Sequence, residues 1–343
     1  MTTTAQNPPP ALEASQSGWE RLAPYRGETY YGLPAIKPSY YGWEVVAYFF
    51  VGGLASAAQF LAAAISLFGR KEDCPTVRAG RYIALAGALA SPGLLIADLH
   101  TPQRWYNMLR IFRRTSPMSI GSWALTTFGL ASGLAAAGQI VKDLFGWRAG
   151  EWAARAASLP AALAGGVVSI YTGTLLAATS NPLWSSAFPF LSSLFASSAA
   201  STATATLTLG TRHPETQRRL AWFAWVSGLA ELGFALLVDR KLRQNSMASE
   251  LRRQPFPRAW AVGVIGLGIA APLAAHTVEL VSRQPSRRVA NTAAVLTLLG
   301  GFLLRAVFVF SGNAAARRPQ HYFRVTQPEN AANPQQTPPR SRR

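Results

Sequence analysis

Charged residues, cysteine and histidine are all scarce in this 343-residue chain. Only 14% of its residues are charged and 49% are hydrophobic, whereas a typical soluble domain is about a quarter charged. The charges stand in short blocks between long uncharged runs, and each helix that spans a bilayer needs about 20 mostly apolar residues. The composition therefore indicates a polytopic membrane protein rather than a soluble one.

The shortage of cysteine and histidine limits which cofactors the chain can hold. Cys74 is the single cysteine, so an intrachain disulfide and a Cys-rich zinc or iron–sulfur site are excluded. A di-haem membrane cytochrome needs paired axial ligands, but of the four histidines only His100 and His276 lie near membrane depth, each alone. We expect no haem, metal or iron–sulfur cluster in this chain, so redox chemistry would require a partner or a diffusible cofactor.

Acidic residues are also few, with 15 Asp and Glu against 33 Lys and Arg and a formal charge of +18. In a soluble protein this excess would suggest nucleic acid. Here the basic residues lie between apolar runs, so we assign them to membrane topology and expect no nucleic-acid partner. Nineteen of them fall on the side of the two termini and thirteen on the other, with Arg305 inside a span. This bias favours a multi-pass protein of the bacterial inner membrane with both termini cytoplasmic.

Three regions follow from composition. Residues 1–40 are rich in Pro, Ser and Thr, lack the apolar core of a signal peptide, and are expected to lie along the membrane face or against a partner. Residues 41–312 form the membrane domain. Residues 313–343 are rich in Pro, Gln and Arg, and we expect them to be disordered.

The membrane domain contains eight candidate spans. Helices are expected because period-two alternation is absent and backbone groups in lipid must pair internally. Recurrent Gly, Ala and Ser predict close helix packing, and the predicted architecture is all-α, with two four-helix bundles. The spans are 41–68, 80–98, 119–143, 155–179, 183–209, 219–239, 259–281 and 288–311.

Helix starts are marked by a capping residue followed by proline. The pairs are Thr101-Pro102, Ser116-Pro117 and Asn181-Pro182. The first predicts a short helix over 102–113, between spans two and three.

That short helix has an apolar and a basic side. Its apolar side comprises Trp105, Met108, Leu109 and Phe112, at helical spacing. The rest of its surface is basic and includes Arg104, Arg110, Arg113 and Arg114. This pattern predicts an interfacial helix, with one side in the bilayer edge and the other facing lipid phosphates or a partner.

Ionisable residues within or near spans are candidates for function because they are costly in lipid. They are Glu44, Asp98, His100, Glu231, His276, Glu279 and Arg305. Asp98 can be functional or can form an interfacial ion pair with Arg104. Glu231 can pair with Arg305, either as a structural pair or as part of a proton path.

For His276 and Glu279 we expect a solvated helix end. Tyr171 lies well inside span four, so its hydroxyl needs an internal or ligand partner. Pro92, in "SPG", predicts a kink in span two that can shape a cavity.

Three motifs stand out: "YFFVGGLASA", "DLHTPQRWYNMLRIF…TSPMSIGSW" and "YTGTLLAATSNPLW". They resemble the NrfD family, the membrane subunit of polysulfide-reductase-type and related molybdoenzyme complexes. The resemblance extends over about residues 38–312, and the middle motif is the most specific.

This resemblance implies a quinone-reactive membrane anchor of a respiratory oxidoreductase. Electrons would pass between a four-cluster, ferredoxin-like iron–sulfur subunit and a quinone (menaquinone or ubiquinone) in the first bundle, and a molybdopterin subunit would hold the substrate site. Tyr171 matches a quinone-binding tyrosine of the family. Tyr48 and Val45 depart from it, because one branch has a quinone-contacting histidine and an asparagine at these positions.

A quinone needs hydrogen-bond donors for its carbonyls and a titratable group linked to water. Glu44, Tyr48, Asp98, His100 and Tyr171 can supply these near one membrane face. Many family members place the iron–sulfur partner outside the cytoplasm, whereas the charge count places the same face inside; we follow the count.

Two alternatives to a quinone-reactive anchor stay open. One is an ion- or proton-translocating subunit or transporter that uses Glu231 and Arg305. The other is a purely structural anchor.

Overall fold

A computed structural model describes residues 36–99, 101–252, 255–282, 286–318 and 321–322. The described part is helical throughout and contains no strand. Seven of its helices are long and apolar enough to cross a membrane, and α6 (Phe190–Gly210) runs beside them as an eighth. The predicted all-α membrane protein with about eight spans is confirmed.

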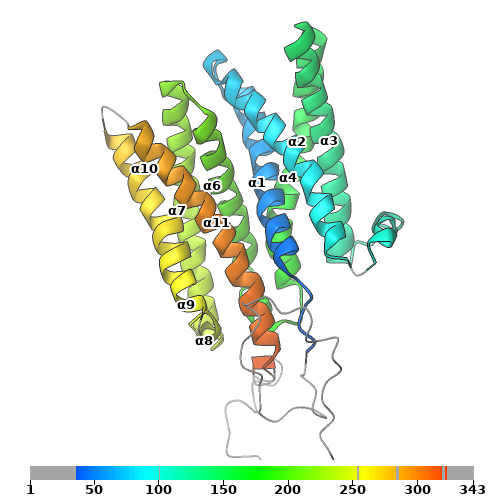
Figure 1. Cartoon of the computed structure of the whole chain (residues 1–343), viewed down its shortest axis with the longest axis vertical. Helices are drawn as coiled ribbons and strands as arrows, with labels where there is room; N and C mark the ends of the chain where they lie inside the picture. Colours follow the sequence, from blue (N-terminus) through cyan, green and yellow to red (C-terminus); the bar gives the residue numbers. More distant parts are fainter. Residues whose placement is uncertain (1–35, 100, 253–254, 283–285, 319–320, 323–343) are drawn as a thin grey trace, which may run out of the picture.

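The long helices form two groups of four, shown side by side in Figure 1. The first group is α1 (Trp43–Phe68), α2 (Cys74–Ala97), α3 (Pro117–Phe145) and α4 (Arg148–Ala177). The second is α6, α7 (Pro214–Gln244), α11 (Arg287–Ala316), and a composite helix of α9 (Phe256–Arg258), the π-helix η4 (Ala259–Ala270) and α10 (Ala271–Val281). The groups are joined because α1 packs on α6 and α11, and α4 packs on α6.

Four shorter elements lie at the ends of these helices. They are η2 (Lys71–Asp73), η3 (Pro102–Leu109), α5 (Pro182–Ser186) and α8 (Ala248–Leu251).

Small residues bring the helices close together, as predicted. A methyl group at Gly138 of α3 would lie 2.6 Å from the backbone nitrogen of Ala154 in α4. One at Gly268 of η4 would lie 2.6 Å from the Cα atom of Gly300 in α11. Such contacts replace the hydrophobic driving force that is absent between helices in lipid.

Helix α6 is not among the seven apolar spans, because its many Ser and Thr residues lower its mean hydropathy. Its hydroxyl groups donate to backbone carbonyls one turn earlier, for example from Thr204 to Ala200 at 2.8 Å and from Thr206 to Thr202 at 2.8 Å. The hydroxyls are thereby satisfied inside the helix, so a polar sequence can occupy a buried position.

Three local predictions differ from the structure. The fifth span is interrupted, because the five-residue α5 precedes α6. The short interfacial helix is a 3₁₀-helix that ends at Leu109 rather than at 113, as is common for short exposed segments with little to bury. Thr101 makes no side-chain cap, whereas Ser116 and Asn181 both accept hydrogen bonds from the first turns of their helices.

The bundles have two ends. The start of α1 and the end of α11 lie together at one end, which we call the terminal face (Figure 1). The ends of α2 and α4 and the start of α3 share that face. We call the other end, with the end of α1 and the start of α2, the opposite face.

Candidate functional site

Two buried tyrosines lie near the terminal face of the first bundle. Tyr48 of α1 is 2% exposed and Tyr171 of α4 is 8% exposed, and the two are close enough to interact electrostatically. The Tyr171 ring lies directly on Gly121 of α3, where any added methyl group would overlap it. The helices thus bring together the two tyrosines predicted to bind quinone, and a glycine makes room for one of them.

Ser91 belongs to the same cluster and was not singled out from the sequence. A methyl group at Gly52 would lie 3.2 Å from Tyr48 Cε2 and 3.3 Å from Ser91 Oγ, which places both side chains beside this glycine. Ser91 is fully buried, and its hydroxyl has no partner among the described residues. The signal in the sequence was the "SPG" stretch, which was read only as a kink.

Asp98 lies within electrostatic range of Tyr41, just before α1. Burial, and then the nearby charge of Asp98, raise the pKa of Tyr41 above its usual value, and Tyr41 in turn lies within electrostatic range of Tyr171. Glu44 is exposed at the same end of α1. His100 lies outside the described residues.

Arg305 of α11 is fully buried and joins the two bundles. Its Nε donates to the carbonyl of Phe49 in α1 at 3.0 Å. Its Nη1 donates to the Gly301 carbonyl at 2.6 Å and to Ser198 Oγ of α6 at 3.0 Å. The guanidinium is therefore held by neutral oxygens, one of them adjacent to Tyr48.

Glu231 of α7 is 3% exposed but forms no direct ion pair with Arg305 among the described residues. Ser198 and Ser201 of α6 lie near its carboxylate, and Arg305 is within electrostatic range, but the Ser201 hydroxyl has no hydrogen-bond partner among the described residues. Ser198 accepts a hydrogen bond from Arg305, so this serine lies near both charged groups.

A cavity of about 10 Å³ is lined by both Glu231 and His276. That volume is at the lower limit for one water molecule. His276 Nδ1 lies 3.3 Å from Glu279 Oε2 in α10, and the two residues are 4% and 8% exposed. The prediction of a solvated helix end is therefore wrong for this pair, because α7 and α11 pack against α10.

The four arginines predicted to dock a partner or lipid are all exposed. Arg104 lies in η3, and Arg110, Arg113 and Arg114 follow it in the connection to α3. This segment leaves the end of α2, so it belongs to the terminal face (Figure 1). Tyr48 and Tyr171 lie near the same face because they are close to the start of α1 and the end of α4. Within the described ranges, no group of three or more His, Cys, Asp or Glu side chains could hold a metal ion.

Comparison with known proteins gives one family. The model of the family described as "Polysulphide reductase, NrfD" matches residues 35–316, which include every helix named above. A search of curated proteins found no match.

Proposed function

This chain belongs to the NrfD family of membrane subunits of redox complexes, and from that premise we propose that it binds a quinone and exchanges electrons with an iron–sulfur partner. The partner is a ferredoxin-like subunit with four clusters, and a molybdopterin subunit completes the complex. The quinone, menaquinone or ubiquinone, takes up two electrons and two protons to become the quinol, or releases them in the reverse direction.

The cluster of Tyr48, Ser91 and Tyr171 is the observation that supports this proposal most. Three buried residues with hydroxyl groups, on α1, α2 and α4, lie near the same membrane face, and Tyr48 and Ser91 share one glycine neighbour. A buried hydroxyl normally has a hydrogen-bond partner, and a quinone carbonyl would supply the one that Ser91 lacks among the described residues. In this proposal Asp98, half-buried at the end of α2, passes protons between this cluster and water.

The basic segment 104–114 supports a partner at the same face. Its exposed arginines favour an acidic docking surface, because complementary charge steers association and fixes orientation. A cluster-bearing subunit at the terminal face would lie close to the tyrosine cluster. We also propose, from the charge count, that this face is cytoplasmic and that the membrane is the bacterial inner membrane.

Quinone content tests the proposal. The complex is purified with native lipid, extracted with solvent, and analysed for quinones by mass spectrometry, with a Tyr48→Phe/Tyr171→Phe double variant as the comparison. We expect quinone to co-purify with the unaltered protein and to be depleted in the variant. Absence of quinone from the unaltered complex, with no quenching of the fluorescence of an added quinol analogue, would contradict the proposal and favour a purely structural anchor.

A second function, proton translocation, is supported by the buried polar line in the second bundle. The line starts at Arg305, beside the tyrosine cluster, and continues through Ser198 and Glu231 to the small cavity. From the cavity it reaches His276 and Glu279 in α10, a helix that ends at the opposite face (Figure 1). Ionisable groups placed in this way within a membrane are typical of proton relays.

A further inference from the structure

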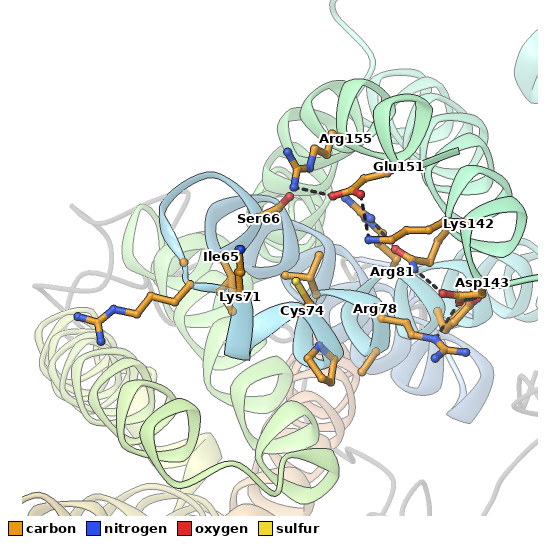
Figure 2. Close-up of a pocket in the computed structure, with 17 residues that line it drawn as sticks. Ile65, Ser66, Lys71, Cys74, Arg78, Arg81, Lys142, Asp143, Glu151 and Arg155 are labelled. Atoms are coloured by element: carbon orange, nitrogen blue, oxygen red, sulfur yellow. Dashed lines mark hydrogen bonds and ion pairs between the residues drawn. The ribbon is translucent and has the colours of Figure 1, made fainter. Parts of the chain in front are cut away.

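A large cavity opens at the opposite face of the first bundle, far along the helices from the tyrosine cluster. It has a volume of about 660 Å³ and lies between the end of α1, the start of α2, the end of α3 and the start of α4. This volume is in the range of cavities that hold small ligands. Figure 2 shows its polar side chains gathered from all four helices and η2.

The lining of this cavity is strongly basic. Six cationic side chains line it against two carboxylates: Arg70, Lys71, Arg78, Arg81, Lys142 and Arg155 against Asp143 and Glu151. Both carboxylates are already engaged, Asp143 by Arg78 at 2.8 Å and Glu151 by Arg155 at 2.6 Å and Lys142 at 3.2 Å (Figure 2). Arg70, Lys71 and Arg81 form no ion pair with any described carboxylate.

Arg81 is the buried charged residue of this site, since its side chain is only 3% exposed. Its Nε donates to Ser158 Oγ at 3.2 Å and its Nη1 to Gln139 Oε1 at 2.6 Å. Its Nη2 is buried and has no hydrogen-bond partner in the described part of the chain. A buried charged donor without an acceptor is costly, so two neutral side chains hold the guanidinium in place while one amino group stays available to a ligand.

The surroundings show which kind of anion can reach Arg81. The cavity lies at the ends of four candidate membrane spans, where lipid headgroups are expected. Beside it, Phe68 is 87% exposed and Phe145 and Trp147 are each 62% exposed, as expected for aromatic side chains at a membrane interface. Guanidinium groups bind phosphate oxygens with paired, charge-assisted hydrogen bonds.

We propose that this cavity binds a phosphate group, supplied by the headgroup of an anionic phospholipid. Arg81 contacts the phosphate from the buried wall of the cavity. Arg70 and Lys71, in the connection between α1 and α2, line the cavity beside it. Free inorganic phosphate has the same chemistry and is the other possible source. The site is at the membrane face away from the proposed quinone cluster, so it is independent of the proposed function.

The test compares lipid retention by the full complex and by variants. The protein is reconstituted in nanodiscs that contain phosphatidylcholine with a minority of phosphatidylglycerol, then released, and the retained lipid is counted by native mass spectrometry. Arg81→Gln removes the buried donor. The double variant Arg70→Gln/Lys71→Gln changes only exposed residues of the same cavity, so its effect on lipid binding does not depend on altering the protein interior. Arg288→Gln is the matched control, because Arg288 is exposed at the same face on the second bundle.

We expect the unaltered protein and the control to retain phosphatidylglycerol. In both test variants we expect the affinity for phosphatidylglycerol to fall about tenfold, as for one lost charge-assisted hydrogen bond. A parallel calorimetric titration with inorganic phosphate distinguishes the sources. Phosphate binding that depends on Arg81, without lipid preference, would support the phosphate site and assign it to the free ion. Equal lipid retention in all four proteins, with no phosphate binding, would overturn the proposal and leave a water-filled cavity.

Discussion

Tyr171 has a packing role and a proposed chemical role, which one substitution can separate. Its ring fills the space over Gly121, and its hydroxyl lies near Tyr48 in the proposed quinone cluster. Tyr171→Phe keeps the ring and removes only the hydroxyl. We expect complex assembly to be unchanged and quinol turnover to fall roughly tenfold, which corresponds to about 1.4 kcal/mol from one lost hydrogen bond.

Steady-state quinol turnover of the purified complex measures this effect. Tyr106→Phe, at an exposed position in η3, controls for loss of a tyrosine hydroxyl outside the cluster. Unchanged turnover in Tyr171→Phe would remove Tyr171 from the site.

Glu231 is the residue on which the proposed proton path depends most. Glu231→Gln keeps the shape of the side chain beside Ser198 and Ser201 but removes the titratable group. We expect quinone turnover to persist while proton movement across proteoliposome membranes, measured with a pH-sensitive dye, is lost. Glu215→Gln, exposed in the first turn of α7, is the control.

The opposite result would give Glu231 a structural role. If proton movement per quinol were the same in Glu231→Gln and in the unaltered protein, the line from Arg305 to Glu279 would not conduct protons.

Residue type decided which site residues could be predicted. Glu231, Arg305 and Tyr171 stand out in a sequence because polar groups inside spans are rare. Ser91 and Gly121 do not stand out, because serine and glycine recur throughout these helices as packing residues. Their roles depend on contacts with α1 and α4, which no local pattern encodes.

Between elements, the contact of η4 with α11 is tight enough to be sensitive to one methyl group. Gly300 Cα lies against Gly268, so Gly300→Ala forces the two helices apart. Overpacking of this kind costs about 1–3 kcal/mol, and we expect a lower thermal midpoint in detergent. Gly233→Ala is the control, since nothing lies within 4 Å of a methyl group there; an equal effect of both substitutions would exclude close packing as the cause.

The segment 104–114 gives a second prediction at this scale. Replacing Arg110, Arg113 and Arg114 together with Gln should weaken attachment of the proposed iron–sulfur partner, because three docking charges are lost. Co-purification at increasing salt concentration measures the attachment. A triple variant whose complex survives high salt as well as the unaltered one would assign these arginines to lipid headgroups.

The spans themselves were predictable because lipid requires internally paired backbone and therefore long apolar helices. The break between α5 and α6 and the 3₁₀ geometry of η3 were not. In α5, Trp184 donates from Nε1 to the Phe308 carbonyl at 2.7 Å and Asn181 donates to Gly312 at 2.8 Å. These contacts with α11 are 124 and 131 residues distant in sequence, so a hydropathy pattern does not reveal them.

Across the whole molecule, the two bundles carry different polar features that meet at Arg305. The first bundle holds the tyrosine cluster at the terminal face and the basic cavity at the opposite face. The second holds the buried line from Glu231 to Glu279, and Arg305 ties α11 to α1 beside Tyr48. If the proposed quinone site and proton path are correct, Arg305 would allow quinone chemistry in one bundle to influence proton movement in the other.

Orientation in the membrane is a property of the whole molecule, and the single cysteine reports it. Cys74 is exposed at the start of α2, on the opposite face. If the charge bias is right, this face is outside the cytoplasm, so a membrane-impermeant maleimide should label Cys74 in intact spheroplasts. Ser249→Cys in a Cys74→Ser background places the thiol at an exposed position of α8 on the terminal face, and it should react only after the membrane is broken. The reverse labelling pattern would put the iron–sulfur partner outside the cytoplasm and show that the charge count gives the wrong orientation for this chain.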